Sequence, residues 1–230
     1  MRRVVVTGLG VVSPVGNDVK TFWENIKAGK CGIGPITKFD TENYKVKVAA
    51  EVRDFEPRDY MEKLDVLHSD IYTQFAIAAA TQAVEESGII GTVPDERIGV
   101  YIGTGIGGID TFTTEHSKLL EKGPRRVSPY FIPMMIANMA AGKLSIKYGL
   151  RGLSKSIVTA CATGAHSIGD AARAIQYGDA DIMVAGGAEA GICDLGLGAF
   201  TSAKTLSKFN DNPTLASRPF DINRDGFIMS

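Results

Sequence analysis

The chain has 230 residues, of which 44% are hydrophobic and 22% charged, and its formal net charge is −1. This composition is ordinary for a globular protein with one substantial core or two small ones, and it gives no electrostatic basis for binding nucleic acid or an anionic membrane. Three cysteines without a C-x-x-C pair, no long apolar run and no signal-peptide pattern lead us to expect a protein of the reducing cytoplasm, away from membranes.

Strands and helices are predicted to alternate along the chain. From the N-terminus we expect a strand over 2–7, a helix that begins at Asn17 or Asp18 and runs to about 28, a half-exposed strand over 47–52, and a helix from a cap at Ser69 or Asp70 to Ser87. Further along we expect a buried strand over 97–102, amphipathic helices over 110–122 and 132–148, a buried strand over 154–159, a helix over 161–177 and a strand over 181–185. This order is typical of an α/β domain with a largely parallel sheet.

The residue that stands out is Cys161, at the junction between the predicted strand over 154–159 and the following helix. The first backbone N–H groups of a helix carry partial positive charge and favour a thiolate over a thiol. Small neighbours, among them Ala160, Ala162 and Gly164, leave room for a substrate. Taken alone, a cysteine is more often a small buried hydrophobe, so the remaining segments have to decide between the two interpretations.

The helix that follows Cys161 carries few charges and many small or apolar residues. We expect it to be buried on most of its circumference, which requires a second layer of structure above it. His166 lies five residues after Cys161, an offset that turns it away from the sulfur on a helix. It is therefore interpreted as a packing or polar contact, with a role as catalytic base as the alternative.

Gly103-Thr104-Gly105-Ile106-Gly107-Gly108 matches G-x-G-x-x-G and follows a predicted strand. One interpretation is a dinucleotide fingerprint, but no acidic strand end follows about 20 residues on, as that motif requires. The preferred interpretation is close backbone packing in a loop that lines a ligand tunnel. The three histidines have no metal-binding spacing, so we expect neither a metal nor another cofactor.

Four segments together resemble the β-ketoacyl-acyl-carrier-protein synthases, most closely the type II enzyme of dissociated fatty-acid synthesis. They are residues 3–16 (RVVVTGLGVVSPVG), the glycine loop 103–108, Thr159-Ala160-Cys161, and Ser217-Arg218-Pro219-Phe220-Asp221 with Arg224-Asp225-Gly226-Phe227. Their order and spacing match the family across the whole chain, although family members are roughly twice as long.

The resemblance implies a thiolase-like fold of stacked α-β-α-β-α layers with the cysteine helix in the middle layer. It also implies that residues 1–230 are the N-terminal ketosynthase half, with the C-terminal half absent from this chain. The family's two catalytic histidines and its lysine would belong to that second half. A homodimer is expected, because the resemblance pairs the strand over 154–159 with its twin.

The resemblance further implies that Cys161 is the acyl-accepting nucleophile. Residues implied to form the acyl pocket are Ile106, Phe131, Ile132, Phe200 and Phe227. Residues implied to dock the acidic carrier protein are Arg125, Arg126 and Lys204; the alternative for these is an ordinary solvated face. Around Lys63 the sequence departs from the family's more basic run, so no docking role is assigned to that residue.

The implied reaction is a decarboxylative condensation between an acyl group on Cys161 and malonyl carried by the phosphopantetheine of an acyl carrier protein. Alternatives within the fold are a type I or a polyketide ketosynthase. Alternatives of another kind are a catalytically incomplete fragment and a non-catalytic partner that shapes the pocket, although such partners usually lose the cysteine. On its own, this chain is expected to be inactive in condensation.

Overall fold

The computed structural model describes residues 2–230, which divide into two compact units. The larger one, called the sheet unit, joins the segment that ends at Val11 to Glu56–Glu189. The smaller one, called the hairpin unit, joins Val12–Phe55 to Ala190–Ser230. Each unit has its own buried apolar core, and each is described by itself below.

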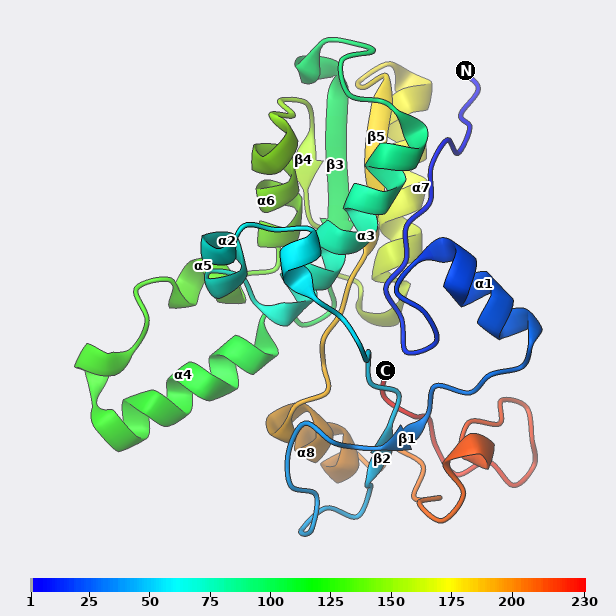
Figure 1. Cartoon of the computed structure of the whole chain (residues 1–230), viewed down its shortest axis with the longest axis vertical. Coiled ribbons are helices and arrows are strands. Elements are labelled where there is room, and N and C mark those ends of the chain that lie inside the picture. The colour runs from blue at the N-terminus through cyan, green and yellow to red at the C-terminus, as the bar shows by residue number, and fades with distance from the viewer. Residues whose placement is uncertain (1) are drawn as a thin grey trace. The chain divides into compact units, whose positions relative to one another are not determined.

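A parallel sheet in the order β4-β3-β5 forms the centre of the sheet unit (Figure 1). The central strand β3 (Ile98–Gly103) pairs along its whole length with β5 (Ile182–Gly187) and briefly with β4 (Ser154–Lys155). Every residue of β3 is buried, as expected for a parallel strand that helices cover on both faces. The expected α/β class and parallel sheet are therefore confirmed.

Helices α3 (Ile71–Ser87), α6 (Met139–Tyr148) and α7 (Thr163–Tyr177) pack on this sheet. The predicted bounds of α3 are confirmed: the Asp70 carboxylate accepts the Tyr72 N–H at its start, and Gly88 ends it at φ +61°. Glycine tolerates this left-handed conformation, which is a common helix terminator. The remaining helices of the unit are α2 (Lys63–Leu67), α4 (Ile109–Lys122) and α5 (Phe131–Met135).

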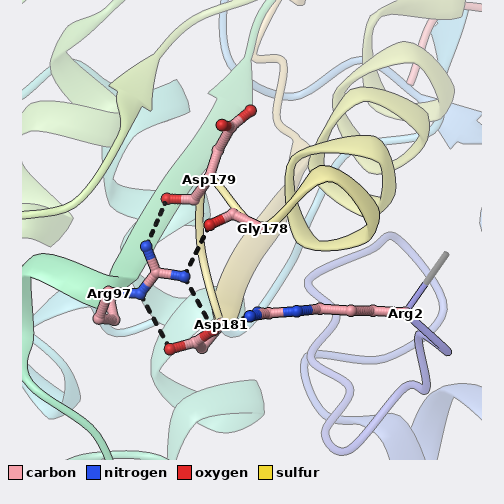
Figure 2. Close-up of polar contacts among 5 residues, drawn as sticks. All are labelled: Arg2, Arg97, Gly178, Asp179 and Asp181. Carbon is pink, nitrogen blue, oxygen red and sulfur yellow. Dashed lines mark hydrogen bonds and ion pairs between the residues drawn. The ribbon is translucent and has the colours of Figure 1, made fainter.

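One ion-pair network ties the beginnings of β3 and β5 together (Figure 2). The Arg97 guanidinium donates to both carboxylate oxygens of Asp181 at 2.9 Å and to the Gly178 carbonyl at 2.8 Å, and Arg2 also donates to Asp181. The Arg97 hydrogen bonds, followed by those from Arg2, hold the pKa of Asp181 well below its usual range. The network thus fixes the register at the end of the sheet opposite the glycine loop.

The hairpin unit contains the antiparallel pair β1 (Gly34–Pro35) and β2 (Val48–Ala49), with helices α1 (Val19–Lys27) and α8 (Asp194–Ser202). Its core includes the buried side chains Ile36, Val46, Ala49, Ile192, Leu197, Leu206 and Met229. Buried Glu51 accepts hydrogen bonds from the Thr37 hydroxyl at 2.7 Å and from the Thr37 and Lys38 N–H groups. Burial raises the pKa of Glu51, but these hydrogen bonds outweigh it and leave the pKa below its usual value.

Three strand predictions were wrong in extent or burial. The strand expected over 2–7 does not form: farther along the same segment, the Leu9 N–H donates to Glu86 at 2.6 Å and the Val11 N–H to the Gln82 side chain at 3.2 Å. At residues 9 and 11, side chains of α3 thus supply partners that a neighbouring strand would otherwise provide. The strand expected over 154–159 is limited to 154–155, which are exposed, and the half-exposed strand expected over 47–52 is the short, buried β2.

The single helix expected over 132–148 is two helices, α5 and α6, separated by an extended residue, Ile136. Its carbonyl accepts a hydrogen bond from the buried Tyr72 hydroxyl at 2.7 Å, and the preceding Met135 carbonyl accepts the Gly108 N–H at 2.9 Å. Tertiary partners therefore stabilise a break that the helical pattern does not reveal. The prediction that α7 is buried on most sides was also wrong: one face is buried, while Ile168 on another is 55% exposed.

Candidate active site at Cys161

Cys161 lies in a single 3-10 turn (Ala160–Ala162) between the end of β4 and the first residue of α7. Its side chain is exposed, as is that of Cys31, whereas Cys193 is buried and its sulfur accepts the Gly196 N–H at 3.3 Å. No side chain caps the N-terminus of α7 at Ala162. Cys161 therefore lies two residues before the first residue of a helix that no side chain caps.

The turn that presents Cys161 is held in an uncommon backbone conformation. Ala160 has φ +53°, in the left-handed region that residues other than glycine rarely adopt. The Thr159 N–H donates to the Thr163 hydroxyl at 2.9 Å, and the Thr159 hydroxyl contacts His166 Nδ1 at 2.8 Å. His166 thus makes a polar contact with the residue before the turn, on the helix that carries the turn.

Glycines without side chains let three backbone segments meet around this turn. A Cβ placed on Gly103 would lie 2.1 Å from the Ile157 carbonyl oxygen and 2.4 Å from the Thr163 methyl carbon. A Cβ on Gly187 would lie 3.0 Å from the Cα of Gly164. Contacts as short as those at Gly103 essentially never occur, so β3 needs glycine there, and the Gly187 contact is tighter than nearly all real ones.

The glycine loop 103–108 is held by one carboxylate, that of Glu189. Its two oxygens accept the Thr104 hydroxyl at 2.8 Å, the Gly105 N–H at 2.7 Å and the Ile106 N–H at 3.2 Å. In dinucleotide-binding loops such N–H groups point at a phosphate. Here an internal anion already occupies them, which disfavours the dinucleotide interpretation and supports close packing.

The pocket and docking residues predicted in the sheet unit lie on the loop and on the elements after α4. Ile106 is 45% and Ile132 55% exposed, while Phe131 is half-buried and its ring lies 6.3 Å from that of Phe112. Exposed Arg125 and Arg126 lie together in the 3-10 turn Pro124–Arg126. Both arginine side chains are therefore exposed to solvent.

The hairpin unit brings its two predicted aromatic residues together. The rings of Phe200 on α8 and Phe227 meet edge to face, with centroids 5.5 Å apart. Phe227 is held by a backbone bridge with Leu206, and Lys204 is exposed with φ +59°. Phe200 and Phe227 therefore form one contact pair.

Sequence reasoning missed Glu189 and Thr104, and it missed the strained conformation of Ala160. A signal for Glu189 did exist, because it follows the Gly186-Gly187 pair that ends a predicted strand. The end of a parallel strand is where ligand and loop contacts gather in such sheets. Ala160 gave no signal, because alanine is unremarkable in a helix start.

Comparisons with known proteins establish the family of the chain. A family model described as "Beta-ketoacyl synthase, N-terminal domain" matches residues 1–230. The chain belongs to the beta-ketoacyl synthase family. Curated relatives named 3-oxoacyl-(acyl-carrier-protein) synthase 2 are 52% identical in Vibrio cholerae, 50% in Coxiella burnetii and 48% in Staphylococcus aureus. Each alignment covers 99% of this chain and 55% of the relative, so this ketosynthase chain spans about half the length of the curated relatives it matches.

Solved structures confirm the thiolase-like ketosynthase fold. A beta-ketoacyl synthase from Burkholderia phymatum has a TM-score of 0.86 at 27% identity, and the ishigamide ketosynthase/chain length factor has 0.88 at 30%. A type II polyketide ketosynthase, AntDE, solved with its acyl-carrier protein AntF and bound to the hexaketide, has 0.84 at 33%. In each case 99% of this chain is covered, with 55–56% of the other.

The described residues contain neither a metal-binding cluster nor a membrane-spanning helix. In residues 2–230, no group of His, Cys, Asp and Glu side chains is arranged to hold a metal ion. Over the same residues, no helix combines the length and the apolar character needed to cross a membrane.

Proposed function

We propose that this chain carries the acyl-accepting step of a 3-oxoacyl-acyl-carrier-protein synthase 2, with Cys161 as the nucleophile. The observation that supports this most strongly is the exposed thiol of Cys161 at the uncapped start of α7, where Gly103, Gly105 and Gly187 let backbone segments approach closely. The names of relatives at 48–52% identity support the substrate class. The polyketide alternative rests on a structure at 33% identity and is the weaker candidate.

In the proposed first step, the Cys161 thiolate attacks the carbonyl carbon of an acyl-phosphopantetheine thioester. The carrier's sulfur leaves and takes up a proton, and the acyl group remains on Cys161. Cys161 closely precedes the start of α7, and helix N-termini are in general sites at which cysteine nucleophiles occur. This step uses residues that this chain supplies.

In the proposed second step, a malonyl carrier loses CO₂, and the resulting carbanion attacks the acyl thioester and releases the Cys161 thiolate. Hydrogen-bond donors must stabilise the malonyl thioester as charge develops on it. By the resemblance, these donors are histidines of a second half, for which residues 1–230 would be the N-terminal partner. We therefore propose that condensation depends on that half. We also propose that the acyl pocket is lined by Ile106, Phe131, Ile132, Phe200 and Phe227. The protein is proposed to work as a cytoplasmic homodimer.

Acyl transfer to the purified chain tests the first step. After incubation with an acyl carrier protein bearing an acyl chain, intact mass analysis should show one added acyl group, which peptide mapping places on Cys161. The Cys161→Ser variant should remain unmodified, while Cys31→Ser, which removes the other exposed thiol, should acylate normally. No acylation of the native chain, or equal acylation of Cys161→Ser, would contradict the proposal.

Carrier docking is tested by comparing two donors of the same acyl group. We propose that Arg125, Arg126 and Lys204 contact the acidic carrier protein. Reversing Arg125 and Arg126 to Glu should slow transfer from the carrier-linked thioester and leave transfer from the small pantetheine thioester unchanged. Equal slowing with both donors would show that the arginines act on the site itself, and equal rates in variant and native chain would remove the docking role.

A further inference from the structure

The Glu189 carboxylate lies where the glycine loop touches the turn that presents Cys161. A Cβ placed on Gly105 would lie 2.7 Å from the Glu189 carboxylate and 3.4 Å from the Cα of Ala160. Glu189 and the strained Ala160 therefore both lie against the same loop residue. Because the Glu189 carboxylate accepts the Gly105 N–H at 2.7 Å, it limits how far the loop can move away from Ala160.

The conformation of Ala160 needs such support. A non-glycine residue at φ +53° is disfavoured by roughly 5- to 150-fold against its relaxed conformations, and it persists only when its surroundings hold it. Around Ala160, Gly103 packs against Ile157 and Thr163, and Gly105 packs against Ala160 itself. The Glu189 carboxylate, which holds the loop at Gly105, is therefore well placed to hold the turn.

A second residue, Thr104, links Glu189 to the rest of the loop. The Thr104 hydroxyl donates to Glu189 at 2.8 Å and accepts the Gly107 N–H at 3.1 Å, and Thr104 is only 1% exposed. On the far side, the Gly108 N–H donates to the Met135 carbonyl at 2.9 Å. The loop is thus fixed at both ends, with Glu189 at the end that lies against Ala160.

We propose that Glu189 is a positioning residue for the nucleophile: it clamps the glycine loop against Ala160 and so keeps Cys161 at the N-terminus of α7. Without the clamp, residue 160 relaxes to negative φ and carries the sulfur away from the helix N–H groups. Glu189 touches no reacting atom in this scheme. The inference rests on the proposed role of Cys161, and it adds a residue that holds the nucleophile rather than one that reacts.

The test measures alkylation of individual cysteines by iodoacetamide in the folded chain, with exposed Cys31 as the internal reference. In Glu189→Ala, the ratio of the Cys161 rate to the Cys31 rate should fall by about tenfold, which corresponds to ~1.4 kcal/mol. In Glu86→Gln, which weakens a backbone hydrogen bond to Leu9 instead, the ratio should stay at the native value. An unchanged ratio in Glu189→Ala overturns the inference.

Rescue separates positioning from a general loss of stability. Glycine adopts positive φ without strain, so Ala160→Gly should restore most of the lost Cys161 rate when combined with Glu189→Ala. A purely structural role for Glu189 would lower the melting temperature, and Ala160→Gly would leave the rate ratio low. Failure of this rescue therefore also overturns the inference.

If Glu189→Ala does not fold, Thr104→Val and Thr104→Ser provide the same test. Valine removes the hydroxyl that joins Glu189 to Gly107 and should lower the ratio, whereas serine keeps the hydroxyl and should preserve it. Equal ratios in the two variants overturn the inference. A native Cys161 that is no faster than Cys31 would contradict the proposed function, while the change between native chain and variants still decides the role of Glu189.

Discussion

Replacing Gly103 with alanine should damage the Cys161 turn by steric contact alone. The added Cβ would lie 2.1 Å from the Ile157 carbonyl oxygen and 2.4 Å from the Thr163 side chain. The first of these is a backbone atom, which cannot move without shifting the segment that leads into Cys161. Gly103 has no positive φ, so backbone strain does not contribute to the effect.

The magnitude follows from the depth of the overlap. Overpacking a rigid site typically costs ~1–3 kcal/mol, and an overlap with a backbone atom places Gly103→Ala at the upper end or above. Gly169 is the matched control, because it lies inside α7 and a Cβ there meets nothing within 4 Å. Alanine at that position should stabilise the protein by ~0.5–1 kcal/mol, since glycine is unfavourable inside a helix.

Chemical denaturation measures both variants against the native chain, and peptide mapping after brief alkylation reports on the turn. Gly103→Ala should lose stability and Cys161 reactivity together, with Cys31 unaffected. Gly187→Ala, whose Cβ would lie 3.0 Å from the Gly164 Cα, should fall between the two. If Gly103→Ala proved as stable as Gly169→Ala, the close approach of β3 to the Cys161 turn would be refuted.

Three further predictions concern the pH response, a helix cap and the acyl pocket. Arg97 lowers the pKa of Asp181 in the folded state, so the ion pair contributes stability above the unfolded pKa of about 3.9, and this contribution is lost as the pH falls below that value. Asp181→Asn should therefore flatten the fall of the melting temperature between pH 5 and 2. An unchanged slope would exclude this role. Asp70 is 2% exposed and accepts the Tyr72 and Thr111 N–H groups, so Asp70→Ala should cost ~1–4 kcal/mol in chemical denaturation, with Asp70→Asn losing less; equal losses would contradict the double cap. Ile106→Phe in the complete enzyme should slow acylation by long chains roughly 5- to 150-fold, as overpacking predicts, and acylation by short chains less. An equal loss with six- and sixteen-carbon acyl carriers would show that Ile106 does not line the tunnel.

Much of the sheet unit could be predicted because its elements carry local signals. Helix α3 begins at an aspartate that caps it and ends at a glycine with positive φ, and both residue types mark these boundaries in the sequence. The buried run that forms β3 and the position of Cys161 before α7 were predicted for the same reason. Local chemistry decides these boundaries whatever the rest of the chain does.

The features that escaped prediction depend on partners far away in the sequence. The break between α5 and α6 is stabilised by the Tyr72 hydroxyl, 64 residues before the carbonyl that it meets. The hydrogen bond from the Gly105 N–H to Glu189 joins residues 84 positions apart. The exposure of one side of α7 also could not be read from its composition, because an apolar helix looks the same whether or not a second layer covers it.

The most direct test of the central claim compares the alkylation rates of the three cysteines in the native folded chain. Brief treatment with iodoacetamide, followed by peptide mapping, gives each rate separately. The uncapped start of α7 predicts that Cys161 reacts faster than Cys31, which is also exposed but lies outside any helix, and that buried Cys193 reacts slowest. A rate at Cys161 equal to or below that at Cys31 would contradict its role as the activated nucleophile.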